Sequence, residues 1–186
     1  MKVSKEQVRE NRRRIVETAS VLFRERGYDG VSVADLMSAA GFTHGGFYKH
    51  FASKADLMAE AMRCGFTQSA ESIASQSRSA FVADYLSRRH RDDRGHGCTL
   101  AALGADSARQ SGAIKAAFAA GLERQLAELT EESAERGLTR ADLLNDMAHL
   151  VGALVLSRAC PDNSPLADEI LDICRARILN PGDAEG

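Results

Sequence analysis

The segment SVADLMSAAGFTHGGFYKHFASK, residues 32–54, decides how the N-terminal part of the chain folds. Ser32 followed by Asp35 is a capping-box pattern that begins a helix. Gly41 ends that helix, because glycine adopts a positive φ at little cost, and Thr43 stands where a second helix would be capped. The segment therefore predicts two short helices joined by a tight turn, the helix-turn-helix arrangement whose second helix enters the major groove of DNA.

A fixed order of apolar, aromatic, glycine and basic positions extends this pattern in both directions. The positions are Ile15, Ala19, Leu22, Phe23, Gly27, Tyr28, Val31, Val33, Leu36, Ala39, Ala40, Gly41, Phe42, Phe47, Tyr48, Lys49, His50, Phe51, Lys54 and Leu57. In this order they resemble the TetR family of bacterial transcriptional regulators over roughly the first third of the chain. The resemblance implies an all-α fold of about nine helices, with an N-terminal three-helix helix-turn-helix DNA-binding domain and a C-terminal helical domain for ligand binding and dimerisation.

The composition fits a folded helical protein. The chain has 186 residues, of which 44% are hydrophobic and only three are proline, values that suit one domain or two small ones sharing a core. No run of about 18 apolar residues indicates a transmembrane helix, and the charged N-terminus lacks the apolar centre of a signal peptide. We therefore expect a cytoplasmic protein without a membrane partner, and free thiols at Cys64, Cys98, Cys160 and Cys174.

Charge is distributed unevenly along the chain, although the net charge is only −2. Residues 1–63 hold 11 Lys and Arg against 8 Asp and Glu, a net charge of +3, whereas residues 64–186 hold 13 against 18, a net charge of −5. A basic N-terminal part on an acidic body suits a protein that docks one end on DNA.

Caps, apolar periodicity and helix breakers divide the chain into three parts. We expect a DNA-binding domain over residues 1–52, an effector-binding and dimerisation domain over residues 53–180, and a disordered tail over residues 181–186. Outside the quoted segment the expected helices cover residues 5–26, 53–79, 81–90, 98–110, 112–136, 139–158 and 166–179. Residues 88–97, RRHRDDRGHG, are expected to form an exposed loop, because two glycines there break a helix.

The resemblance also implies which residues contact double-stranded operator DNA. The first turn of the second helix faces base edges, the residues after it follow the DNA backbone, and two helix starts face phosphates. In that order these positions are Thr43, His44, Gly45 and Gly46, then Tyr48, Lys49 and His50, then Ser32 and Lys54.

Three features of this set have a second interpretation. Gly45 and Gly46 permit either close approach of the backbone to DNA or a loosely formed helix that DNA orders. His50 is either a phosphate contact or a buried capping residue. The arginines at positions 12–14 form either a solvated helix face or further phosphate contacts.

By the same resemblance the C-terminal domain binds a small-molecule effector and forms a homodimer. The pocket is expected between the connecting helix and residues 81–129. An apolar or aromatic molecule would fit this pocket. The pocket candidates, each with the alternative of an ordinary core position, are Met62, Phe66, Phe81, Tyr85, Leu103, Phe118 and Leu122. The expected interface residues, with the alternative that their helices are the core of a monomer, are Met147, Val151, Leu154, Val155, Ile170 and Ile173.

Cys98 suggests a different mode of regulation. It stands at a predicted helix start with Arg94 and His96 nearby, a setting that favours the thiolate. The protein is thus expected to be a repressor of a palindromic operator released by an inducer, or alternatively a redox or electrophile sensor acting through Cys98. A helical interaction protein that does not bind DNA is the remote alternative.

An enzyme is not expected. The spacing of His90, His96 and Cys98 matches no established metal-ligand pattern. The chain contains no metalloprotease motif and no glycine-rich phosphate loop. We therefore assign no catalytic residue, no metal ligand and no cofactor.

Overall fold

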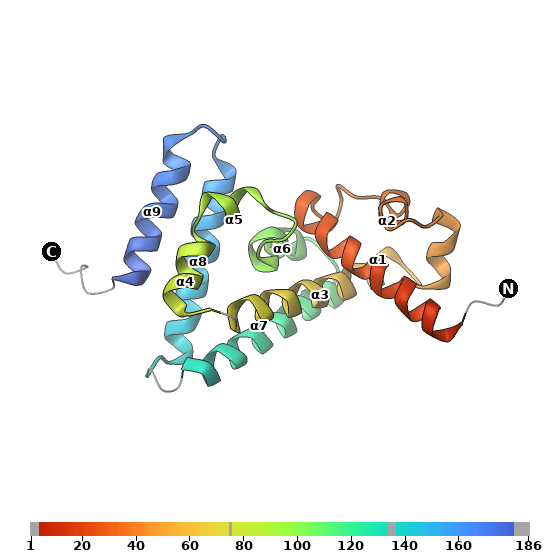
Figure 1. Cartoon of the computed structure of the whole chain (residues 1–186), viewed down its shortest axis with the longest axis horizontal. Coiled ribbons are helices and arrows are strands. Elements are labelled where there is room, and N and C mark those ends of the chain that lie inside the picture. Colours follow the sequence, from red (N-terminus) through yellow and green to blue (C-terminus); the bar gives the residue numbers. More distant parts are fainter. Residues whose placement is uncertain (1–3, 75, 134–136, 181–186) are drawn as a thin grey trace.

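The computed structural model describes residues 4–74, 76–133 and 137–180, and all regular structure within them is helical. The chain forms a head and a body, which lie at opposite sides of Figure 1. The predicted tail at residues 181–186 lies outside the described residues. Among those that are described, no helix combines the length and the apolar character needed to cross a bilayer.

The head consists of α1 (Lys5–Arg26), α2 (Val33–Ala39) and the 3₁₀-helix η1 (His44–Lys49). The predicted capping box at the start of α2 is confirmed, because Ser32 and Asp35 bond reciprocally through side chain and backbone. The turn between α2 and η1 is also confirmed, since Gly41 has a φ of +80°. Local sequence signals therefore account for α2 and for the turn that follows it.

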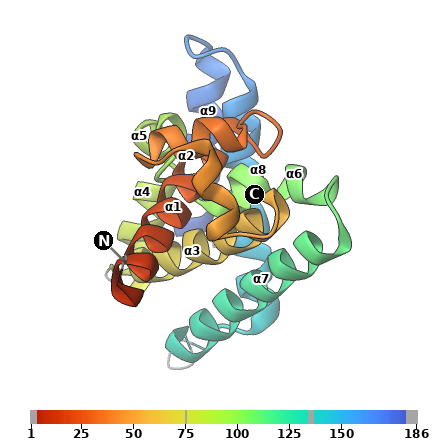
Figure 2. The same ribbon diagram turned by 90° about the vertical axis from the view of Figure 1, so that its right-hand side faces the viewer.

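The body consists of α3 (Lys54–Ala74), α4 (Arg78–Tyr85), α5 (Arg88–Asp92), α6 (Thr99–Ala108), α7 (Gly112–Ser133), α8 (Arg140–Ala159) and α9 (Pro165–Leu179). Helix α3 starts beneath the head and packs along α7, and α8 and α9 form a hairpin at the far end of the body (Figures 1 and 2). A second capping box, formed by Thr139 and Asp142, begins α8.

The segment between α3 and α6 differs from the prediction. Helix α3 ends at Ala74 instead of continuing to residue 79, and the helix predicted over residues 81–90 is two helices, α4 and α5. The described residues therefore contain ten helices and not nine. The predicted exposed loop over residues 88–97 was wrong in its first half, where α5 is capped by the Ser87 hydroxyl.

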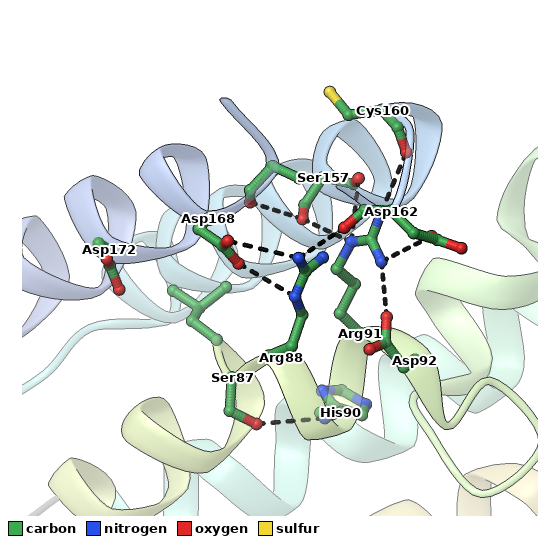
Figure 3. Close-up of polar contacts among 12 residues, drawn as sticks. Ser87, Arg88, His90, Arg91, Asp92, Ser157, Cys160, Asp162, Asp168 and Asp172 are labelled. Carbon is green, nitrogen blue, oxygen red and sulfur yellow. Dashed lines mark hydrogen bonds and ion pairs between the residues drawn. The ribbon is translucent and has the colours of Figure 1, made fainter. Parts of the chain in front are cut away.

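Arg91 explains why this segment is helical and packed. Its side chain is only 2% exposed, and its guanidinium donates to the Ser157 hydroxyl, to the Cys160 carbonyl and to Asp162 (Figure 3). These partners lie on α8 and on the turn after it, about seventy residues away in sequence. A local reading of RRHRDDRGHG gave no sign of them.

Two apolar clusters hold the molecule together. The larger one joins the head to α3, α6 and α7, and it includes Phe23, Phe47 and Phe66. The smaller one joins α4 to the α8–α9 hairpin around Leu86 and Leu154. The larger cluster crosses the predicted boundary at residue 52, so the head packs directly on the body.

Candidate DNA-binding surface and effector cavity

One side of η1 packs on the core of the head, and the other side is exposed. Phe47 is buried against the head, where its ring packs on Phe51. Its neighbours point outward: Tyr48 is 70% exposed, and Thr43, His44 and Lys49 are also exposed. Thr43 occupies the N-cap position, but its hydroxyl makes no capping hydrogen bond. The hydroxyl, imidazole, phenol and ammonium groups on this face are therefore free to meet a ligand.

Gly45 and Gly46 are not required by the packing of the chain. A Cβ at Gly45 would meet no atom within 4 Å, and one at Gly46 would make only ordinary contact with Met37. Neither has a positive φ. Since two glycines weaken a helical segment by about 1 kcal/mol each, the reason for them lies outside the monomer. This favours the interpretation of close backbone approach to DNA.

Replacing Gly45 with alanine is expected to leave the melting temperature unchanged or higher, and to weaken DNA binding about tenfold or more. The added methyl group has room in the free protein but would keep the backbone from the groove floor. Thermal unfolding and fluorescence anisotropy with labelled DNA measure the two effects. An alanine variant that binds DNA as well as the parent would contradict the close-approach interpretation.

The remaining predicted phosphate contacts are partly engaged within the chain. Lys54 donates from Nζ to the Tyr28 carbonyl at 2.6 Å, so one of its three ammonium protons holds the α1–α2 turn. The Ser32 hydroxyl and backbone N–H both donate to Asp35. Because Ser32 has no donor left for a phosphate, we assign it a capping role and remove it from the contact set.

His50 closes η1 at the edge of this face. Its Nδ1 is buried without a hydrogen-bond partner in the described chain. Burial, with the charges of Arg12 and Lys49, lowers the pKa of the imidazole. The His50 carbonyl accepts from Arg12 Nε at 3.3 Å.

The arginines at positions 12–14 also have partners within the head. Arg12 forms a two-pronged ion pair with Glu60 of α3, and Arg13 pairs with Glu10 and Glu17 along α1. The Arg14 guanidinium lies over the Phe42 ring. These contacts favour the solvated-face interpretation for this run.

An apolar cavity of about 140 Å³ lies inside the body. Its walls come from α3, α4, α6, α7 and α8. Leu129, Leu143 and Leu150 supply much of the apolar lining, and the charged groups at its edge, Arg78 and Asp146, pair with each other at 2.7 Å. A mostly apolar cavity with few polar groups is typical of a small-molecule site.

The predicted pocket residues divide into two groups. Phe81 and Tyr85 line the cavity. The other five belong to the larger core cluster and do not line this cavity: Met62, Phe66, Leu103, Phe118 and Leu122. The middle of α3 packs too closely on α7 to leave space, because Gly121 faces the Phe66 ring. The cavity opens farther along α3, near Ile73.

A second, polar cavity of about 180 Å³ adjoins the first. The two share five lining residues: Ile73, Phe81, Tyr85, Cys98 and Gln125. Buried Arg24 of the head also lines the polar cavity, and it donates to Gly95, Thr99 and Gln68. The polar cavity therefore separates the apolar cavity from the C-terminal part of α1.

Cys98 occupies the N-cap position of α6 in the wall common to both cavities. The two cations predicted beside it are differently placed: Arg94 is exposed, and His96 pairs with Asp93. The imidazole that does contact it is His90, whose Nε2 accepts from the Cys98 backbone N–H at 3.0 Å. The free thiol is half-buried.

His90 is held as a neutral imidazole. Nδ1 donates to the Tyr85 carbonyl at 2.7 Å while Nε2 accepts from Cys98, so a proton on Nε2 would face another N–H. Burial is the main cause of a lowered pKa for His90. The neutral ring joins α4 to α6 behind the apolar cavity.

Unfolding free energy is expected to fall as the pH is lowered from 7 to 5, with His90 as one source. Since the folded pKa lies below the ordinary 6.5, the unfolded chain takes up the proton first, and the stability present above pH 6.5 is lost as the pH falls. One such group contributes at most about 1.4 kcal/mol per pH unit. Urea unfolding of His90→Gln should show a shallower pH slope.

The exposed His44 provides the control, because His44→Gln should keep the parental slope. His50 also has a lowered pKa, so the slope of His90→Gln should decrease without vanishing. An unchanged slope in this variant would contradict the neutral role of His90.

The predicted interface residues do not all face outward. Leu154 is 0% exposed in the smaller core cluster, so it cannot reach a partner, and Met147 and Val151 line the apolar cavity. Ile170 is partly buried against the smaller core cluster. Val155 and Ile173 are exposed, together with two leucines that the prediction missed, Leu156 and Leu166.

The outward side of α8 is apolar from Ala148 to the end of the helix. Ala148, Val155 and Ala159 are exposed along it, and Gly152 leaves open space above its Cα. Ile173 of α9 is also exposed. An apolar surface of this extent on a helical hairpin is typical of a contact with another chain.

Hydrogen bonds at both ends of α6 join it to the head. Asp106 near the end of α6 accepts from the Tyr28 backbone N–H at 3.0 Å, and Arg24 reaches Thr99 at its start. Tyr28 is thus held by α6 through its N–H and by Lys54 of α3 through its carbonyl. Movement of α3 or α6 would therefore reposition the head.

Comparison with known sequences places the head in a described family. The model of "Bacterial regulatory proteins, tetR family" matches residues 15–61. The transcriptional repressor DhaR of Mycobacterium sp. (strain GP1) is 25% identical over 90% of this chain and 92% of its own length. The repressor KstR2 of Mycobacterium tuberculosis is 39% identical over 57 residues, which cover 31% of this chain and 28% of KstR2.

Solved structures share the complete fold. The reduced form of E. coli NemR has a TM-score of 0.70 at 20% identity, covering 92% of this chain and 97% of NemR. AibR, solved with isovaleryl coenzyme A and operator DNA, has a TM-score of 0.61 at 21% identity, covering 90% of this chain and 97% of AibR.

Proposed function

The chain belongs to the TetR family of bacterial transcriptional regulators and is a helix-turn-helix repressor, and from this premise we propose that it binds a palindromic operator as a homodimer and releases it when a small molecule enters the apolar cavity. Members of this family act by binding DNA and are not enzymes. An operator-binding repressor works where the chromosome is, so we place its action in the cytoplasm.

The proposed DNA contacts come from the exposed side of η1. Thr43 and His44 would read base edges, with the backbone at Gly45 and Gly46 close to the groove floor. Tyr48 and Lys49 would bond phosphates. This division follows the exposure of each residue and the general rule that phosphate contacts position a protein while base contacts specify the sequence. His50 and Lys54 complete the set at its edge.

The proposed dimer interface is the outward face of the α8–α9 hairpin. Its centre is formed by Val155, Leu156, Leu166 and Ile173, with Gly152 permitting close helix contact. A two-fold arrangement of the hairpins would present two heads to two half-sites, as helix-turn-helix proteins require for a palindrome. Residues 1–52 and 53–180 would then act as the DNA-binding and the effector and dimerisation parts.

The single observation that carries the effector proposal is the apolar cavity against α3 and α6. These helices hold the Tyr28 backbone from both sides. A molecule that spread the cavity walls would shift α3 and α6, and with them the distance between the two recognition helices of the dimer. By analogy, AibR was solved with both a coenzyme A ester and operator DNA.

Modification of Cys98 is a second candidate for the release signal, favoured by the place of the thiol in the wall of both cavities. The guanidinium of Arg24 lines the polar cavity together with this thiol. An oxidant or electrophile entering either cavity would reach this thiol, and a bulky adduct would press on the start of α6.

A release assay separates these two signals. DNA flanking the gene is labelled and bound to wild type and to Cys98→Ser, and apolar, aromatic and thiol-reactive compounds are added. We expect release by a non-covalent compound in both proteins. Release only by thiol-reactive compounds, and only from wild type, would replace the cavity mechanism with the cysteine mechanism.

A further inference from the structure

Two buried polar atoms in the cavity wall have no partner in the described chain. They are the Tyr85 hydroxyl oxygen and Gln125 Oε1, and each residue is only 7% exposed. Buried polar groups are almost always hydrogen-bonded in folded proteins. The Cys98 thiol is within hydrogen-bonding reach of the Tyr85 hydroxyl, but a thiol is a weak hydrogen-bonding group that leaves the hydroxyl poorly satisfied.

Both residues lie in the wall that the apolar and the polar cavity share. A molecule occupying the apolar cavity would therefore have hydrocarbon around most of its surface and polar groups at one end. Tyr85 offers a donor, and Gln125 offers an acceptor. One group on the molecule that both accepts and donates would satisfy the two together.

The charges around the apolar cavity cancel. Arg78 pairs with Asp146 at 2.7 Å and also donates to the Ile178 carbonyl. A charged ligand would have to break that pair or remain without a counter-ion in an apolar space, which is costly. The lining thus disfavours carboxylates and ammonium groups.

We propose that the apolar cavity binds an uncharged molecule of about one aromatic ring that carries a hydroxyl group, with the hydroxyl between Tyr85 and Gln125. The size follows from the cavity of about 140 Å³, since an engineered apolar cavity of about 150 Å³ holds benzene. The hydroxyl accepts from Tyr85 and donates to Gln125, whereas a ketone or an ether could only accept. This inference rests on the proposed function of the cavity as the effector site.

Arg24 presents the main competing ligand chemistry. An acid reaching from the apolar into the polar cavity would approach this buried guanidinium. However, Arg24 already donates from Nε and from both terminal nitrogens to Gly95, Thr99 and Gln68. The unpartnered atoms of Tyr85 and Gln125 therefore favour a hydroxyl over an acid, and the test includes both.

Three compounds of matched shape test the proposal on the DNA-free full chain: p-cresol, toluene and 4-methylbenzoate at pH 7.5. Isothermal titration calorimetry should give p-cresol at least about tenfold tighter binding than toluene, because its hydroxyl makes two hydrogen bonds that toluene cannot make, and no measurable binding of the benzoate. Equal binding of p-cresol and toluene, or tighter binding of the benzoate that Arg24→Gln abolishes, would overturn it.

Matched variants test whether the hydroxyl group of the ligand lies between Tyr85 and Gln125. Tyr85→Phe should weaken p-cresol about tenfold and leave toluene unchanged, and Gln125→Met should do the same. Tyr28→Phe is the control, because this tyrosine is also buried but lies in the head, away from the cavity. If Tyr85→Phe retained full p-cresol affinity while thermal unfolding showed it folded, the proposal would fail.

Operator binding distinguishes this inference from the proposed function. If p-cresol binds as expected but does not release DNA, the ligand assignment stands and the cavity is not the effector site. If another compound releases DNA through the cavity while p-cresol does not bind, the effector site stands and the ligand assignment is wrong.

Discussion

Replacing Tyr48 and Lys49 together with alanine is expected to weaken operator binding at least about 100-fold. Both side chains are exposed on η1, so their loss leaves the core of the head intact. A hydrogen bond to a charged group contributes about 1.5 kcal/mol or more, and a dimer would lose four such contacts. Fluorescence anisotropy with labelled operator measures the loss, and the slope of affinity against salt should also decrease.

Lys115→Ala is the matched control for this variant. Lys115 is an exposed lysine on α7 in the body, so its loss changes the net charge equally and should leave operator affinity nearly unchanged. The melting temperature of both variants should remain within a few degrees of the parent. Equal loss of binding in the control would mean that net charge, and not the face of η1, governs DNA binding.

Placing glutamate at Leu156 and Ile173 together is expected to convert a dimer into a monomer and to weaken operator binding about 100-fold or more. These side chains are 60% and 61% exposed in the single chain, so the variant should fold, but four carboxylates would be buried in the assembled interface. A monomer also loses the gain from binding two half-sites at once, which reaches about 10² to 10⁴. Light scattering measures the mass.

The control places glutamate at Ala120, which is exposed on α7. This variant should remain a dimer. If the variant at Leu156 and Ile173 stayed dimeric, the interface would lie elsewhere on the body. If it became monomeric and kept full operator affinity, the chain would bind single half-sites and the palindrome would be unnecessary.

The head could be predicted from the sequence because its signals are local. Helices α1 and α2 each start with a side-chain cap within three residues, as Ser32 with Asp35 shows, and Gly41 supplies the positive φ of the turn. Phe47 of η1 packs on Phe51, which follows the end of that helix, and Tyr48 and Lys49 are left outside. Such short-range rules act in the same way whatever the rest of the chain does.

The body could be predicted only in part because its decisive contacts are distant in sequence. The burial of Arg91 depends on Ser157 and Asp162, so a charged, glycine-rich segment was misread as a loop. The division of α8 between cavity, core and surface was also invisible. Its apolar residues cover more than one face, which indicated several neighbours but not which face met which neighbour.

The cavity illustrates the same limit. Phe66 and Phe118 were as reasonable as Phe81 from the sequence, yet they pack on each other with ring centroids 5.9 Å apart. Close approach of α3 and α7 at Gly121 fills that region. Gln125, whose side-chain oxygen has no hydrogen-bond partner, is part of the cavity wall. It lies in an ordinary amphipathic helix, and its sequence neighbours give no sign of a binding site.

Footprinting of the DNA that flanks the gene, with wild type beside the Tyr48→Ala, Lys49→Ala double variant, tests the central claim most directly. We predict two protected half-sites related by two-fold symmetry for wild type, centred about one helical turn apart or a multiple of it, and none for the variant at the same concentration. Protection of a single asymmetric site, or equal protection by both proteins, would contradict a dimeric repressor that reads DNA through η1.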